Sequence, residues 1–181
     1  MMLLNTMTNA GQKLGTLIDL ASDTNYITHK AAKALNLQSE PVTLVVSGVG
    51  GMSASVKTKR YLLKLKVNTP KGLLKPYKLV CYGLDKIAEV HQHVSAQKLQ
   101  SLFPEVPFEE LKRPREVQLL LSHKEGQLAP QKIRTVGDLV LWDGPLGKVI
   151  GGTHPDLCLV VLPTKPPLKL TKVVTPAEMA S

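Results

Sequence analysis

Short apolar stretches separated by turn residues recur along the first half of the chain, and this rhythm predicts β-strands. The apolar pattern at residues 2–8 and 13–19 predicts two strands around a turn at 9–12. Residues 41–46 and 53–67 predict a second and longer hairpin, because β-branched and alternating apolar residues are typical of half-buried strands. We therefore expect the first half of the chain to be built mainly from hairpins.

The rest of the chain continues this pattern but breaks it at two places. Thr28 is expected to cap a short helix over 29–35. Further strands are predicted at 73–82, 117–121, 133–142 and 148–152. Short helices are predicted at 85–91, 95–102 and 108–112. Together these elements indicate a mostly β domain with a small helical insert at about 84–114.

The end of this domain is expected near residue 152. Beyond it only 157–162 has the pattern of an ordered segment, and 163–181 contains four prolines with little apolar periodicity. We therefore divide the chain into a domain over 1–152 and a largely flexible C-terminal extension over 153–181.

Length and composition fit this assignment to one domain. A chain of 181 residues with 43% hydrophobic residues can bury a core, and its 4% aromatic content means that the core must be aliphatic. No apolar stretch approaches the roughly 20 residues of a membrane span, and the N-terminus lacks a signal-peptide pattern. We expect an intracellular, cytoplasmic protein without a membrane partner, in which Cys81 and Cys158 stay unpaired.

The formal net charge of +9 is concentrated in one part of the sequence. Residues 41–84 contain no Asp or Glu but eight basic residues: Lys57, Lys59, Arg60, Lys64, Lys66, Lys71, Lys75 and Lys78. Such a segment can bind phosphate groups. It can equally be the solvated face of a half-buried strand, since Lys64 and Lys66 alternate with apolar residues.

The most informative acidic residue is Asp19, which ends the apolar run of residues 13–19 and is followed by Leu20 and Ala21. A carboxylate at the end of a buried strand is costly unless it is hydrogen-bonded or functional. Asp19 therefore either orders a turn or serves in chemistry. For Asp23, close by in the sequence, a role in a turn or a helix cap is favoured over a catalytic one.

The other candidate sites are weaker. The segment Gly48, Val49, Gly50 and Gly51 joins two predicted strands, so it is expected to form a hairpin tip with positive φ angles and not a phosphate-binding loop. Cys81, His91 and His93 match no zinc-binding spacing, and we predict no metal site.

The order of these motifs resembles that of the retropepsin-like aspartic proteases, and most closely the peptidase domain of BEL/Pao-type retroelement polyproteins. The likeness covers about residues 2–152: a strand ending in Asp19, a short helix, a glycine hairpin, a long strand and the late apolar strand 119–121. It implies a closed β-barrel of the acid-protease type and aspartic endopeptidase activity on a polypeptide substrate. It also implies that Asp19 is catalytic, that substrate contacts Leu20, Ala21, Gly48, Val49, Gly50 and Gly51, and that no cofactor is required.

The same resemblance implies a homodimer, because the chemistry needs two carboxylates that share one proton and the chain has one such motif. The chain departs from the family at Asp19-Leu20-Ala21, where the family has Asp-Ser/Thr-Gly, and at Ser122, where the late strand of the family ends in Gly. Two alternatives therefore stay open. One is an inactive remnant that serves as a dimerisation or interaction module, and the other, less favoured, is a basic module that associates with nucleic acid.

Overall fold

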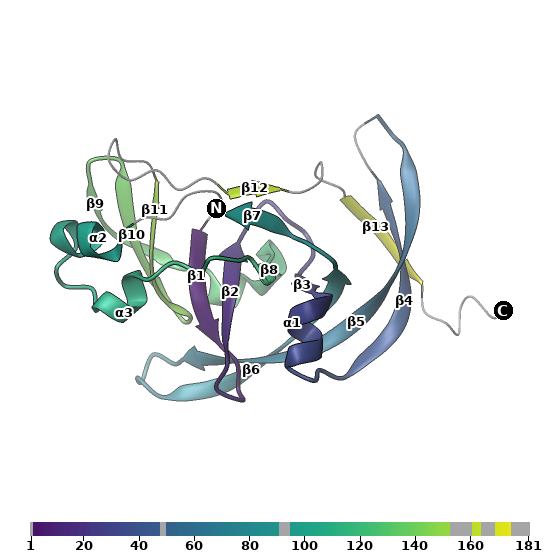
Figure 1. Cartoon of the computed structure of the whole chain (residues 1–181), viewed down its shortest axis with the longest axis horizontal. Coiled ribbons are helices and arrows are strands. Elements are labelled where there is room, and N and C mark those ends of the chain that lie inside the picture. Colours follow the sequence, from purple (N-terminus) through teal and green to yellow (C-terminus); the bar gives the residue numbers. More distant parts are fainter. Residues whose placement is uncertain (1, 48–49, 91–94, 153–160, 164–168, 175–181) are drawn as a thin grey trace.

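The protein is mostly β, as predicted. The computed structural model describes residues 2–47, 50–90, 95–152, 161–163 and 169–174, and strands predominate among them (Figure 1). No helix in these ranges is long and apolar enough to cross a membrane.

The main sheet has eight strands in the order β1-β2-β8-β3-β6-β5-β4-β13. These are β1 (Met2–Met7), β2 (Lys13–Ile18), β8 (Leu119–Leu121), β3 (Tyr26–Thr28), β6 (Leu74–Leu84), β5 (Ser53–Asn68), β4 (Ser39–Ser47) and β13 (Lys169–Val174). The β1–β2, β4–β5 and β5–β6 hairpins form as the pattern predicts. Strand β8 lies between β2 and β3, parallel to the first and antiparallel to the second, so the late apolar strand occupies the interior of the sheet.

This sheet does not close into a barrel within the described part of the chain. β4 covers one edge of β5 as far as Tyr61 and then departs, which uncovers the rest of that edge. The β1 side of the sheet returns there at one bridge, between Thr8 and Leu65, and the Asn9 N–H donates to the Lys64 carbonyl at 2.9 Å. The mostly β class is therefore observed, whereas a continuous ladder around a barrel is not.

The largest core cluster lies on the inner face of this sheet. On β5 the residues Leu63, Leu65 and Val67 are almost completely buried, and the residues between them face outward, as a period of two requires. Leu119 and Leu121 on β8 are 0% and 1% exposed. Their neighbours in the cluster include residues of β2, β3, β5, β6 and α1 (His29–Ala34), so the strand predicted at 117–121 is present as β8 and contributes to the core.

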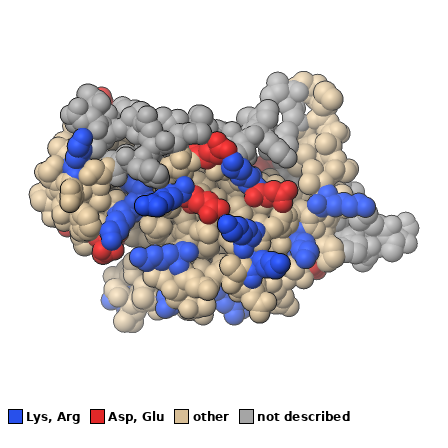
Figure 2. Space-filling view, viewed as in Figure 1, with Lys and Arg blue, Asp and Glu red and all other residues tan. Residues whose placement is uncertain are grey.

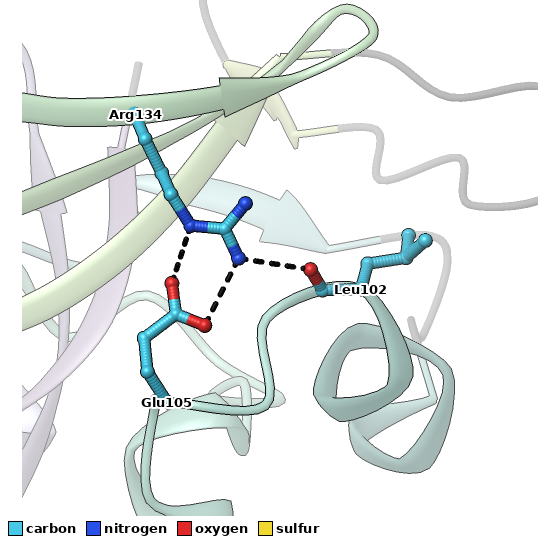
Figure 3. Close-up of polar contacts among 3 residues, drawn as sticks. All are labelled: Leu102, Glu105 and Arg134. Carbon is cyan, nitrogen blue, oxygen red and sulfur yellow. Dashed lines mark hydrogen bonds and ion pairs between the residues drawn. The ribbon is translucent and has the colours of Figure 1, made fainter.

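The helical insert packs against a second sheet. α2 (Ala96–Leu102) and α3 (Phe108–Leu111) form a core with β9 (Gln131–Val136), β10 (Leu139–Gly144) and β11 (Gly147–Gly152). Arg134 on β9 joins the two parts, because its guanidinium forms two hydrogen bonds to the Glu105 carboxylate and one of 3.1 Å to the Leu102 carbonyl (Figure 3). The same guanidinium lies 4.7 Å from the Phe103 ring centroid. The predicted helices at 95–102 and 108–112 are thus present and fixed in place.

The helix cap predicted at Thr28 is confirmed, and a second cap is present at Ser95. The Thr28 hydroxyl accepts from the Ala31 N–H at the start of α1, and the Ser95 hydroxyl accepts from the Lys98 N–H at the start of α2. A 3-10 helix, η1 (His123–Leu128), follows β8 and was not predicted.

The helix predicted at 85–91 is wrong. Ala88–Val90 forms strand β7, which pairs antiparallel with β12 (Val161–Pro163), and residue 91 lies outside the described ranges. Ile87 and Ala88 are buried in a core cluster with Leu3, Leu17 and Val117. Tertiary packing and a distant strand partner therefore override the local composition.

The C-terminal extension is also more structured than the sequence indicated. Within 163–181, expected to be flexible, β13 pairs antiparallel with β4, with Lys169 opposite Ser47 and Val174 opposite Thr43. The sequence of β13 is rich in β-branched residues, which favour strands once an edge is available. The edge of β4 supplies that partner.

Candidate active site

Asp19 follows directly on β2, which lies between β1 and β8 in the main sheet. Its backbone N–H donates to the Leu121 carbonyl at 2.9 Å, which extends the parallel β2–β8 pairing by one residue. Asp19 is half-buried there. The sheet therefore presents this carboxylate at the point where the chain turns from β2 towards β3.

The turn after Asp19 is held by the carboxylate itself. Asp19 Oδ1 accepts a hydrogen bond of 3.0 Å from the Ala21 N–H, and the Asp19 carbonyl accepts one of 3.1 Å from the Ser22 N–H. Oδ2 has no hydrogen-bond partner among the described residues. This arrangement fits an Asp that orders a turn and equally one that keeps an oxygen available for chemistry.

Leu20 and Ala21 both point into solvent, and the Leu20 side chain is 48% exposed. Because the Leu20 side chain stays in contact with water, it contributes little burial energy to the fold. The Ser or Thr hydroxyl that the resemblance implies at this position is absent, because the residue is Leu20. Among nearby hydroxyls, the Ser22 Oγ donates to the Thr24 carbonyl at 3.0 Å and so acts inside its own loop.

A second loop, after β8, holds the Asp19 turn from the side. The His123 N–H donates to the Ser22 carbonyl at 3.1 Å, and His123 Nδ1 lies 2.6 Å from the same oxygen. Since a carbonyl only accepts, that ring nitrogen carries a proton. The two loops are therefore tied together beside Asp19.

Asn25 makes the most extensive contacts between these loops, and sequence reasoning missed it. Its Oδ1 accepts from the N–H and the Oγ–H of Ser122, at 2.8 and 3.0 Å. Its Nδ2 donates to the Val80 carbonyl at 3.2 Å and to Glu125 Oε1 at 2.9 Å. Both Asn25 and Ser122 are buried, so this amide satisfies polar groups that would otherwise be left unpaired. The sequence shows only an Asn directly before the short strand β3, which does not reveal these distant partners.

The network continues from Glu125 to β6. The Tyr77 hydroxyl donates to Glu125 Oε2 at 2.6 Å. Burial and this hydrogen bond raise the pKa of Tyr77 to about 12, so the phenol keeps its proton at physiological pH. Burial, together with the nearby Glu125 charge, raises the pKa of the Cys81 thiol, which is unpaired and inert as a nucleophile.

The glycine hairpin is only partly described. Gly48 and Val49 lie outside the described residues. Gly50 and Gly51 have φ angles of +88° and +75°, and an added Cβ would meet nothing within 4 Å at either, which confirms the expected conformation of the tip. In Figure 1 the tip of the β4–β5 hairpin lies at the upper right, to one side of β2, which runs near the centre of the view. No hydrogen bond between described residues joins this glycine pair to Asp19, Leu20 or Ala21.

Other predicted groups do not form a site within the described residues. Asp23 Oδ1 accepts from the Thr24 hydroxyl at 3.0 Å, in keeping with a local turn. His91, His93 and Cys158 lie outside the described ranges, and no group of three His, Cys, Asp or Glu residues that could hold a metal ion occurs inside them. Comparisons with protein-family models, with curated proteins and with solved structures found no match to this chain.

Proposed function

We propose that the chain is a retropepsin-like aspartic endopeptidase domain of a retroelement polyprotein. The observation that carries this proposal is the place of Asp19, at the end of an interior strand, with Oδ1 fixed by the Ala21 N–H and Oδ2 unbonded within the described part. The bridge between Thr8 and Leu65 supports the barrel of that fold, because it brings the first edge of the sheet back to β5.

The reaction needs a second carboxylate. In a dyad, one carboxylate takes a proton from a water whose oxygen attacks the peptide carbonyl carbon, while the protonated partner gives its proton to the carbonyl oxygen. Asp23 is engaged by Thr24, so a second copy of Asp19 supplies the partner and the active form is a homodimer. Leu20 and Ala21 then lie beside the substrate, and Gly48, Val49, Gly50 and Gly51 cover it.

One observation favours the alternative of an inactive dimerisation or interaction module. Leu20 exposes an apolar side chain at the position where a hydroxyl would brace the two loops of a dimer. Such a side chain can bury against a partner without positioning the dyad. A displacement of the dyad by about 1 Å costs on the order of a hundredfold in rate, so dimerisation and catalysis can separate.

The test measures association and cleavage in the same variants. Sedimentation at micromolar concentration reports the dimer, and a broad peptide library reports cleavage. We expect near-background cleavage by the parent and weak, measurable cleavage after Leu20→Ser with Ala21→Gly. Asp19→Asn in that background abolishes cleavage, because an amide cannot take a proton from water, whereas the matched variant Asp23→Asn leaves it intact.

Three results contradict the proposal. Cleavage that survives Asp19→Asn reveals another catalyst or a contaminant. A protein that stays monomeric and cleaves nothing cannot assemble the dyad. A doubly substituted protein that dimerises and still cleaves nothing makes the interaction module the better account.

A further inference from the structure

We propose that the outer face of the β5–β6 hairpin binds the phosphate backbone of nucleic acid. This face, here called the basic ribbon, carries Lys64 and Lys66 on β5 and Lys78 on β6, with Lys71 in the connecting turn. The proposal is independent of the peptidase function.

The fold directs these lysines outward. The alternate residues Leu63, Leu65 and Val67 are buried in the main core, so Lys64 and Lys66 must point away from it. Lys64 lies directly opposite Lys78 in the antiparallel register. Like charges in directly opposed positions destabilise a sheet, so the fold gains nothing from this pair.

No acidic residue offsets this charge. Residues 41–84 contain no Asp or Glu, and the ion pairs between described residues all involve other basic groups, such as Arg60 with Glu40 and Lys112 with Glu109. In Figure 2 the lowest part of the molecule, where β6 runs in Figure 1, shows basic side chains and no acidic ones. The basic ribbon is therefore complementary to a polyanion.

A groove of about 470 Å³ continues this surface at the end of the ribbon. Lys66 and Leu74 line it from β5 and β6, and Lys13 lines it from the start of β2. Lys112 and Lys148 also line it but are paired with Glu109 and Asp143. Glu109 and Glu110 line the groove as well, and Lys13 interacts electrostatically with Glu109. The unpaired positive charge is therefore that of the ribbon face, up to Lys66.

The spacing and shape of the ribbon fit the regular phosphate backbone of a duplex. Alternate residues on a strand are about 6.8 Å apart, which equals two nucleotide steps of about 3.4 Å rise each along the axis of a duplex. A two-stranded ribbon also fits the major groove of a duplex. The four cations of the ribbon are lysines, which bind phosphate as point charges.

The chain has few aromatic residues, and among those described no Trp, Tyr or Phe lies exposed on this face to stack on bases. Contacts from lysine to phosphate carry no base information. We therefore expect binding without sequence preference and with a strong dependence on salt.

The experiment uses the full chain and a fluorescein-labelled duplex DNA of mixed sequence and about 20 base pairs, titrated by anisotropy between about 50 and 200 mM NaCl. The parent is expected to bind with a micromolar Kd, with log K falling linearly against log salt. In the triple variant Lys64→Gln, Lys66→Gln and Lys78→Gln, we expect at least tenfold weaker binding and a slope shallower by about two to three.

A second triple variant tests whether binding depends on the lysines of the ribbon or only on the net charge of the protein. Lys30→Gln, Lys98→Gln and Lys132→Gln remove the same charge from exposed positions on α1, α2 and β9. This control is expected to keep the slope and most of the affinity. Thermal melts establish that both variants fold, so a loss of binding is not a loss of structure.

Three outcomes overturn the proposal. The first is a parent that does not bind the duplex at 50 mM NaCl, and the second is an equal loss in the two triple variants. The third is tighter binding of polyglutamate than of DNA, abolished by the ribbon substitutions, which would assign this surface to an acidic polypeptide.

Discussion

The substitution Asn25→Asp tests the network that joins the two loops beside Asp19. The parent side chain is 5% exposed and donates from Nδ2 to the Val80 carbonyl and to Glu125 Oε1. The substitution keeps the shape and the oxygen that accepts from Ser122. It removes both donors and places a new carboxylate oxygen about 2.9 Å from the existing one, the present length of that hydrogen bond.

The expected loss of stability follows from these two bonds. A hydrogen bond to a charged group contributes about 1.5–3 kcal/mol and a neutral one about 1 kcal/mol. We therefore expect the free energy of unfolding at pH 7 to fall by about 2.5–4 kcal/mol. For a chain of this length each kcal/mol lowers Tm by about 2–4 °C, so Tm should fall by about 5–16 °C.

The loss should depend on pH in one direction. The neighbouring carboxylate and burial raise the pKa of the introduced carboxyl in the folded state above its unfolded value of about 3.9. A raised folded pKa contributes stability below the unfolded pKa, and this contribution is lost as pH rises through the folded pKa. The deficit relative to the parent should therefore be largest at pH 7 and should shrink towards pH 4.

Thermal melts followed by circular dichroism at pH 7, 5.5 and 4 check both expectations. Asn68→Asp is the matched control, because it introduces the same charge at an exposed strand end. Two results would refute the idea that this network holds the two loops together. One is a Tm for Asn25→Asp within about 2 °C of the parent at pH 7, and the other is a difference in Tm that does not become smaller between pH 7 and pH 4.

Three further substitutions test other contacts, each by thermal or chemical unfolding. Gly15→Ala should cost about 2–3 kcal/mol or more, because its Cβ would lie 2.0 Å from a backbone oxygen, whereas Gly126→Ala meets nothing within 4 Å and should be nearly neutral. Arg113→Ala should cost about 2–4 kcal/mol, because it leaves two carbonyls on β1 and β11 unpaired, and the exposed control Arg115→Ala should cost under 0.5 kcal/mol. Lys78→Glu should stabilise the fold by about 0.2–1 kcal/mol, because the new carboxylate would lie directly opposite Lys64 on β5. Unchanged or lower stability would contradict this cross-strand register.

The elements that sequence predicted well are those whose partners are close in the chain. The β1–β2 and β4–β5 hairpins depend on turns and on alternation within each strand. The helix cap at Thr28 depends on a hydrogen bond to a residue three positions away. Short range made these features predictable from sequence.

The elements that sequence predicted wrongly depend on distant partners. β7 pairs with Val161–Pro163, and β13 pairs with β4, so neither is specified by its own residues. In the candidate site, the position of Asp19 followed from the strand pattern. The bonds from Asn25 to Ser122 and Glu125 could not be predicted, since 97 and 100 positions separate these pairs. A single sequence does not show which of its distant residues come into contact.

The place of β8 between β2 and β3 governs the order in which the protein can fold. Gly15 and Gln118, which bond to each other across the β2–β8 pair, are 103 positions apart. Closing a loop of that length costs about 4 kcal/mol of chain entropy before the pairing returns any of it, so we expect folding on the slow timescale of proteins rich in long-range contacts. During synthesis the hairpins can form early, but the inner edges of β2 and β3 stay unpaired until residues 119–121 have left the ribosome. Those two edges are then the sites at which a nascent chain is most exposed to aggregation.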